Sequence, residues 1–275
     1  MTDSNAQFSD LPSDATGELR FHVLSSHCFG NTRQLRVWLP PGYSSAQNEG
    51  RRYPVLYLND GQNLFDPATA FAGVDWRVSE TLVRLIGEVA VPPMIVVGID
   101  NATVERIREF LPYKALFPPV PKPLGKRYPE FLIHEIMPFI QRTYRIAKGA
   151  KNTGLGGSSL GALISLYTVI AKPGIFGRLL LESPSLFVSN RQLLKDSRAV
   201  ESWPQRIFLG VGTQESGQRE RDLRIVDDVR SLEHTLHLGG LREKRLCLEI
   251  QEGATHCEAA WAERFPRAVS FLFGK

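Results

Sequence analysis

One serine lies in a glycine-rich segment that could expose a nucleophile. Ser159 is the central residue of a G-x-S-x-G pattern, Gly157-Ser158-Ser159-Leu160-Gly161. This pattern is typical of a sharp turn from a strand into a helix, where larger residues in place of the glycines would collide with neighbouring backbone. The free amides at the start of such a helix also attract developing negative charge. The segment therefore predicts Ser159 as a nucleophile, with the amide of Leu160 as one oxyanion donor.

A serine hydroxyl needs a base to remove its proton, and the base needs an acid to orient it. In the strand–turn–helix arrangement the chain order is serine, acid, histidine, so the base must follow Ser159. His234 and His237 fall in a segment with helical spacing, where a solvated histidine is the ordinary interpretation. His256 follows an apolar run across a short turn, in a loop at the expected carboxyl edge of a sheet. We therefore assign the base to His256.

The acid should also lie just beyond the carboxyl end of a strand. Glu215 meets this condition, because it follows the apolar run 207–211 after three loop residues. Asp222 is an alternative, whereas Asp227 and Asp228 belong to the following helical segment and are expected to face solvent. The sequence thus favours Glu215 as the acid and leaves Asp222 open.

A second oxyanion amide should come from a loop after an earlier strand. Leu58-Asn59-Asp60-Gly61-Gln62 follows the apolar run 55–58, and its glycine would let the backbone approach a ligand closely. An ordinary Asn-Asp-Gly turn is the alternative interpretation of these residues.

The elements that would position these residues alternate along the chain. Apolar runs of three to six residues predict strands buried on both faces. These runs are 34–39, 55–58, 94–99, 179–181, 207–211 and 246–250. Apolar residues at helical spacing predict helices over 76–86, 129–141, 162–171 and 222–238, the last with Leu223, Val226, Val229, Leu232 and Leu236 on one face. The alternation predicts an α/β fold with a mostly parallel sheet.

Composition excludes several classes of protein. The chain has 275 residues, 43% of them hydrophobic, and 33 basic against 29 acidic side chains give a net charge of +4. Disordered, collagen-like and coiled-coil chains do not have this balance, and no apolar run approaches the roughly 20 residues that span a bilayer. The slight basicity does not indicate nucleic acid. Three widely spaced cysteines argue against a disulfide framework and a structural zinc site, and we expect neither metal nor organic cofactor.

The ends and one irregular segment complete the organisation. We expect a polar tail over 1–16 without a secretory signal, a single domain over 17–275 and a cytoplasmic location. Within 101–129, the stretch 112–129 is rich in proline and carries four basic residues and no acid: Lys114, Lys122, Lys126 and Arg127. It is either a solvated surface excursion or a lip over the active site, where it could favour an anionic substrate.

Several segments together resemble the putative esterase family of the α/β-hydrolase superfamily, which includes esterase D, enterochelin esterases, feruloyl esterases and mycolyltransferases. The matching segments are 39–43 (LPPGY), 55–66 (VLYLNDGQNLFD), 97–101 with Arg106 and 109–112, the Ser159 motif, 183–186 (SPSL) and 253–256 (GATH). The resemblance implies an α/β-hydrolase fold, with helices on both faces of the sheet. Asn59, where many relatives have another residue, and Ala162, in place of a second glycine, depart from the family pattern.

The resemblance also implies roles for further residues. Gln62 would donate the second oxyanion amide, and Asp60 would face the alcohol or leaving group. Trp76 would lie near the substrate cleft, although core packing is an equal alternative. Arg106 and Glu109 would lie on the rim and contact substrate, unless they form a plain surface ion pair.

These residues predict a carboxylic-ester hydrolase that acts through an acyl-enzyme on a small-molecule ester. The ester could carry a short acyl, a hydroxycinnamoyl or a siderophore-type group. Two other functions remain open. The acyl group could pass to a sugar or alcohol acceptor, which would make the protein an acyltransferase, or the chain could be a catalytically silent binding module on the same scaffold.

Overall fold

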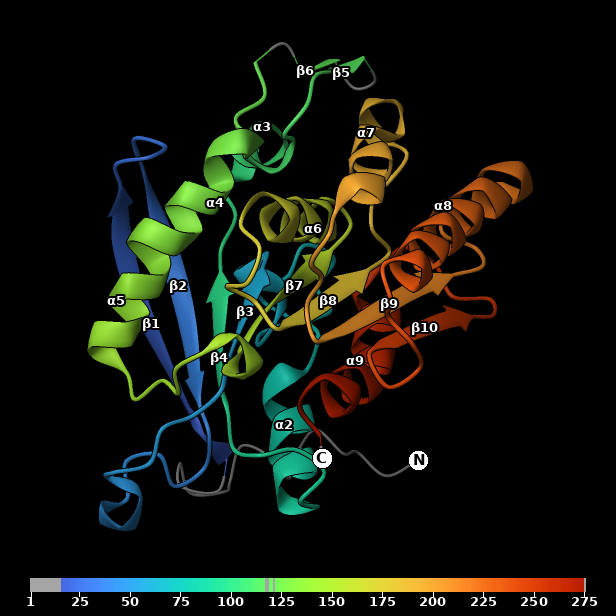
Figure 1. The fold of residues 1–275 in the computed structure, drawn as a ribbon. Coiled ribbons are helices and arrows are strands. Elements are labelled where there is room, and N and C mark those ends of the chain that lie inside the picture. The colour runs from blue at the N-terminus through green and yellow to red at the C-terminus, as the bar shows by residue number, and fades with distance from the viewer. Residues whose placement is uncertain (1–15, 117–118, 121, 275) are drawn as a thin grey trace.

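The computed structural model describes residues 16–116, 119–120 and 122–274, so most of the predicted polar tail lies outside the described residues. Its centre is an eight-stranded sheet in the order β1-β2-β4-β3-β7-β8-β9-β10 (Figure 1). The strands are β1 (Glu18–Ser26), β2 (Asn31–Leu39), β3 (Val55–Asn59), β4 (Ile95–Ile99), β7 (Thr153–Ser158), β8 (Arg178–Glu182), β9 (Arg206–Gly212) and β10 (Leu246–Gln251).

The sheet is mostly parallel, which confirms the prediction. Strands β4, β3, β7, β8, β9 and β10 run in parallel, whereas β1 pairs with β2 and β2 pairs with β4 in antiparallel fashion. Strand β1 was not predicted, because it is an edge strand whose side chains alternate between half-buried and exposed instead of forming an apolar run. Phe21 and Val23, for example, are exposed on it.

Helices cover both faces of the sheet (Figure 1). One apolar core lies under α2 (Val78–Gly87) and α9 (Glu258–Phe273). The other core lies under the remaining helices, which are α3 (Arg106–Phe110), α4 (Tyr128–Glu130), α5 (Met137–Thr143), α6 (Leu160–Ala171), α7 (Val188–Asp196) and α8 (Arg219–Leu238). A π-helical turn over 131–136 joins α4 to α5. No helix of the described ranges has both the length and the apolar character required to cross a bilayer.

Helix α8 corrects two details of the sequence interpretation. Leu223 is 57% exposed, although the spacing placed it on the apolar face, because Asp222 is the residue of that turn buried against the protein. The carboxylate of Asp222 accepts hydrogen bonds from the amide and the hydroxyl of Ser216, both at 2.6 Å. Asp228, expected in solvent, is buried and pairs with Arg191 at 2.7 Å.

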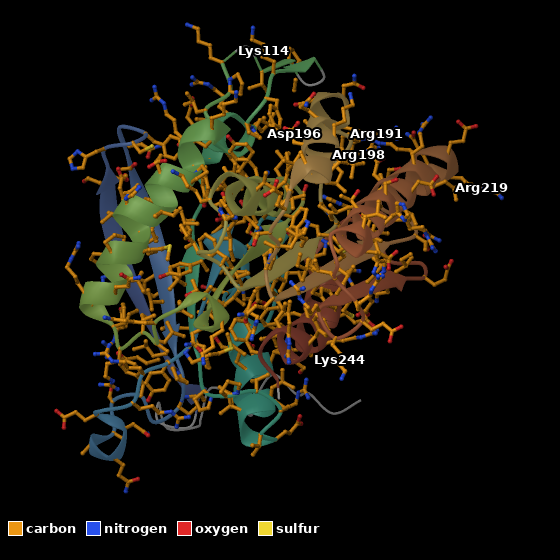
Figure 2. The ribbon with its side chains drawn as sticks, in the orientation of Figure 1. Lys114, Arg191, Asp196, Arg198, Arg219 and Lys244 are labelled. Carbon is orange, nitrogen blue, oxygen red and sulfur yellow. The ribbon has the colours of Figure 1, made fainter. Side chains whose placement is uncertain are left out.

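The proline-rich segment carries a small hairpin, β5 (Ala115–Leu116) with β6 (Pro119–Val120), of which residues 117 and 118 lie outside the described ranges. Figure 2 shows Lys114 beside this hairpin and Asp196 on α7. The hydroxyl of Tyr113 donates a hydrogen bond to Asp196, and Lys126 lies 5.9 Å from the Tyr113 ring centroid. The described part of 112–129 therefore contacts α7.

Candidate active site

Ser159 occupies a strained turn between β7 and α6. Its backbone angles are φ 55° and ψ −122°, and a non-glycine residue with positive φ needs surrounding structure to hold it there. The amide of Ser159 donates to the carbonyl of Glu182 at 2.9 Å, and its carbonyl accepts from the amide of Ser185 at 3.2 Å. Strand β8 and the loop that follows it therefore hold the peptide unit of the candidate nucleophile on both sides.

The two motif glycines are closely packed at this turn, with little room for a side chain. A Cβ on Gly157 would lie 3.0 Å from the carbonyl carbon of Gly161, and one on Gly161 would lie 3.0 Å from Oδ2 of Asp60. Asn59, which departs from the family pattern, stabilises the same turn. Its side-chain amide donates to the carbonyl of Gly161 at 3.1 Å and to the hydroxyl of Ser165 at 2.9 Å.

Glu215 and His256 meet beside this turn. Nδ1 of His256 lies 2.5 Å from Oε2 of Glu215. The other carboxylate oxygen accepts from the hydroxyl of Ser183 and from the amide of Gly212, both at 2.6 Å. Burial by itself would raise the pKa of Glu215, but the hydrogen bonds from His256, Ser183 and Gly212 outweigh it and hold the pKa below its ordinary value. Glu215 is thus a buried carboxylate suited to orient an imidazole.

Two residues that the sequence did not assign to the site support this carboxylate. Nε1 of Trp261 donates to the hydroxyl of Ser183 at 2.9 Å, so this hydroxyl links the indole to Glu215. The Trp261 ring also packs edge-on against the imidazole of His256, with centroids 5.1 Å apart and planes at 87°. The sequence of the SPSL segment gave no signal that Ser183 supports Glu215, because this contact joins residues far apart in the chain.

The hydroxyl of Ser159 points towards another serine in this structure. Its Oγ lies 3.2 Å from Oγ of Ser185, and among the described residues it makes no hydrogen bond to His256. Ser159 and His256 nevertheless line the same cavity. Catalytic hydrogen bonds are often long without substrate and tighten when it binds.

The two predicted oxyanion donors have free amides. Within the described ranges, neither the amide of Gln62 nor that of Leu160 donates to a protein acceptor. The Gln62 turn is fixed, because its side-chain oxygen accepts from the amide of Asn101 at 3.2 Å and its carbonyl accepts from Thr69 at 2.7 Å. Gly61 is required here, since a Cβ would lie 2.5 Å from the backbone of Gly98.

A cavity of about 650 Å³ opens over these groups. Its lining comes mainly from three segments, the loop after β3, the loop after β4, and the start of α9. The lining residues are Asp60, Gln62, Asn63, Thr69, Phe71, Ala72, Asp100, Asn101, Thr103, Arg106, Ser158, Ser159, His256, Cys257, Glu258 and Trp261. No group of three or more His, Cys, Asp or Glu in the described part of the chain is arranged to hold a metal ion.

Comparison with known proteins identifies the family of the chain. Residues 26–272 match the model of the family described as Putative esterase. The chain belongs to this family. The esterase is therefore a carboxylic-ester hydrolase with an α/β-hydrolase-type fold, as the sequence predicted.

Individual relatives are distant. Over 263 residues the esterase is 25% identical to Uncharacterized protein YbbA of Bacillus subtilis, covering 92% of this chain and 96% of the relative. It is 28% identical over 200 residues to Ferri-bacillibactin esterase BesA of the same organism, covering 66% and 65%. The enterobactin esterase FES of Shigella flexneri has a similar fold, with a TM-score of 0.72 at 20% identity, and the match covers 96% of this chain but 59% of that one.

Of the residues expected to contact substrate, Asp60 and Arg106 line the cavity of the esterase. Nε and Nη2 of Arg106 pair with the two oxygens of Asp60 at 2.7 and 2.8 Å, and Asn101 donates to the same carboxylate at 2.7 Å. Asp60 is therefore ion-paired within the protein. Of the stretch 101–129, Asn101, Thr103 and Arg106 line the cavity, whereas no described residue of the proline-rich part 112–129 does.

Glu109 and Trp76 lie elsewhere in the esterase. Glu109 is 1% exposed and pairs with Arg33 of β2 at 2.6 Å, so it neither pairs with Arg106 nor lines the cavity. Trp76 is 2% exposed and packs against Trp261 and Phe265 in the core under α9. Both positions correspond to structural roles, and for Trp76 this is the core packing that the sequence left open.

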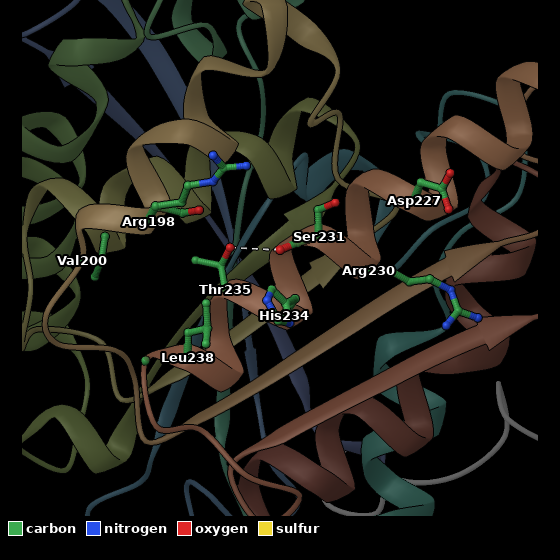
Figure 3. A pocket seen from close by; sticks show the side chains of 10 residues that line it. Arg198, Val200, Asp227, Arg230, Ser231, His234, Thr235 and Leu238 are labelled. Carbon is green, nitrogen blue, oxygen red and sulfur yellow. Dashed lines mark hydrogen bonds between the residues drawn. The ribbon is translucent and has the colours of Figure 1, made fainter.

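The esterase has a larger cavity, about 900 Å³, between the end of α7 and α8 (Figure 3). Arg198, Arg230 and His234 lie around it, and Thr235 donates to the carbonyl of Ser231 at 2.9 Å. Those three basic side chains are exposed, and this cavity contains none of the candidate catalytic residues. Cavity size alone thus does not mark the active site.

Proposed function

We propose that the protein is a serine carboxylic-ester hydrolase that acts through an acyl-enzyme, with Ser159, His256 and Glu215 as its triad. The observation that carries the proposal is the 2.5 Å hydrogen bond between buried Glu215 and His256, which lines the same cavity as Ser159 at its strained turn. A buried carboxylate on Nδ1 leaves Nε2 available to act as the base.

The reaction follows from these positions. Nε2 of His256 takes the proton of Ser159 as its Oγ bonds to the ester carbonyl carbon. The resulting oxyanion accepts hydrogen bonds from the amides of Gln62 and Leu160. The imidazolium, held by Glu215, then protonates the leaving alcohol as the ester C–O bond breaks. Water, deprotonated by His256, then attacks the acyl-enzyme. The acyl C–Oγ bond breaks, the imidazolium returns its proton to Oγ of Ser159, and the carboxylic acid leaves.

The substrate is a small to medium ester, such as a short acyl, hydroxycinnamoyl or siderophore-type ester. A cavity of about 650 Å³ is in the range of sites for small molecules. The similarity to the ferri-bacillibactin esterase supports the siderophore-type class.

Covalent labelling tests the nucleophile. The wild-type protein should react with a fluorophosphonate probe and hydrolyse p-nitrophenyl butyrate, and Ser159→Ala should abolish both. Ser231→Ala, at an exposed position of α8, removes a hydroxyl outside this cavity and serves as the control. Full hydrolysis by Ser159→Ala would refute the proposal.

Glu215→Gln tests the acid separately. This variant retains the shape of the side chain but cannot stabilise the imidazolium, so we expect kcat to fall by a factor on the order of 10³ to 10⁴. Unchanged kcat would exclude Glu215 from the triad.

A further inference from the structure

The active-site cavity is lined by three carboxylates, and their neutralisation differs. Asp60 forms a two-bond pair with Arg106, and Asp100 forms one with Arg36 at 2.8 and 3.0 Å. Glu258 has no such partner, because no basic nitrogen of the described residues lies within 4.0 Å of its carboxylate oxygens. Of the three carboxylates, Glu258 is thus the one without an ion pair among the described residues.

Glu258 is held firmly in this position. The residue is 6% exposed and begins α9, two residues after His256. Its Oε1 accepts from Nδ2 of Asn63 at 3.2 Å, and Oδ1 of the same asparagine accepts from the amide of Phe71 at 3.0 Å. The second oxygen, Oε2, accepts no hydrogen bond from a side chain of the described residues. Among side chains of the described residues, Asn63 is thus the single donor to this carboxylate, which leaves it capacity to accept a hydrogen bond from a ligand in the cavity.

Burying a carboxylate without a paired positive charge is unfavourable. Burial accordingly raises the pKa of Glu258, and the charge of Asp60 raises it further. A hydrogen bond from its own backbone and the charges of His256 and Arg106 oppose this rise. The dipole of α9 offsets part of the cost, but an exposed side chain at the first helical position would obtain the same benefit without burial. A bound group that donates a hydrogen bond to the carboxylate would offset the rest of the cost of burial.

We propose that Glu258 determines specificity, by accepting a hydrogen bond from a hydroxyl or ammonium group on the acyl or alcohol part of the ester. This inference rests on the proposed hydrolase function and names its substrate class. Phe71, whose backbone amide donates to the same asparagine, lines the cavity and is 90% exposed. An apolar part of the substrate could therefore contact Phe71 while its hydroxyl or ammonium group binds Glu258.

Matched esters test the assignment. In each pair, one ester carries a hydroxyl or ammonium group two to six bonds from the ester link and the other carries hydrogen or methyl there. One series varies the acyl part and another the alcohol part. The measured quantity is the ratio of kcat/KM within a pair, for the wild type, Glu258→Gln and Glu258→Leu. Glu252→Gln, an exposed glutamate before His256 that does not line the cavity, is the charge-matched control.

We expect the wild type to favour at least one donor-bearing ester by about 10- to 100-fold, which is the range of a hydrogen bond to a charged group. Glu258→Leu should reduce that ratio to near one, Glu258→Gln should reduce it partly, and Glu252→Gln should not change it. The preference for the ammonium-bearing esters should fall more in Glu258→Gln than the preference for the hydroxyl-bearing esters, because the positive charge of the ammonium also attracts the carboxylate.

Three results would overturn the inference. The wild type could favour no donor-bearing ester by more than about threefold, the preference could survive in Glu258→Leu, or both members of every pair could lose activity equally. The last result would mean that Glu258 acts on the charge of His256 instead. Because the readout is a ratio, it is independent of the labelling of Ser159, so failure of the proposed hydrolase mechanism would be recognised separately. Circular dichroism of each variant confirms that it is folded.

Discussion

The hydroxyl of Ser183 joins Trp261 to Glu215, and its removal should weaken both stability and catalysis. In Ser183→Ala, Glu215 loses one of its three hydrogen-bond donors, and a hydrogen bond to a charged group contributes about 1.5–3 kcal/mol. The buried Nε1 of Trp261 also loses its acceptor, at a cost of about 1–3 kcal/mol. Allowing for partial relaxation, we expect the free energy of unfolding to fall by about 3 kcal/mol.

A double-mutant cycle isolates this hydroxyl. Trp261→Phe removes the indole N–H but retains an aromatic ring, so Ser183→Ala leaves no indole donor unpaired in that background. Urea unfolding of the wild type, both single variants and the double variant should therefore give a coupling energy of about 1–2 kcal/mol. In the same proteins, kcat/KM for p-nitrophenyl butyrate should fall by about tenfold in Ser183→Ala, because Glu215 orients His256 less firmly. The reasoning is refuted if Ser183→Ala changes the free energy of unfolding by less than about 0.5 kcal/mol, or if the effects of the two substitutions on this free energy simply add.

Three further predictions concern the scaffold. Burial raises the pKa of Glu182 to about 7 against the opposing effect of Arg264, so the folded state binds the extra proton between pH 4.5 and 7, and the free energy of unfolding should fall as pH rises through this window. Thermal melts of Glu182→Gln should show a flatter pH profile, and an unchanged slope would contradict the assignment. Glu109→Gln leaves the charge of buried Arg33 unpaired and should cost about 3–5 kcal/mol in urea unfolding, whereas replacing both residues by Met should cost less; a larger loss in the double variant would argue against this. Gly156→Ala would place a Cβ 2.7 Å from the Cβ and the carbonyl oxygen of a β8 leucine, and should lower stability by about 2–3 kcal/mol, a prediction that a wild-type melting temperature would exclude.

Sequence reasoning located the elements whose signals are local. Most of the central strands are nearly continuous apolar runs, because helices bury them on both faces. Strand β7 (TGLGGS) has no such run, and it is marked in the sequence by the glycines of the G-x-S-x-G turn at its end. The structure brings Ser159, Glu215 and His256 to one edge of the sheet because each follows a parallel strand. Chain order and strand ends were therefore sufficient to nominate these three residues.

Other features depend on contacts that no local pattern records. Glu109 lies three residues after Arg106 on a five-residue helix, yet one reaches the cavity and the other is buried against β2. Helix α9 was missed although it carries Glu258 and Trp261, since the serine motif and the histidine loop held the recognisable signals. The supporting role of Ser183 likewise arises only when segments distant in sequence are folded together.

The end of β8 contributes no residue of the proposed triad, yet it touches both ends of it. The carbonyl of Glu182 and the amide of Ser185 hold the peptide of Ser159, while the hydroxyl of Ser183 holds Glu215. The cavity wall, by contrast, comes mainly from the loops after β3 and β4 and from the start of α9. In the proposed mechanism, the segment that aligns the triad is thus largely separate from the segments that would contact the substrate. An engineer could randomise residues 71, 72 and 103 to change the accepted ester while keeping Thr69 and Asn101, which hold the Gln62 turn. A library that includes residues 182–185 would instead disturb the contacts that hold Ser159 and Glu215.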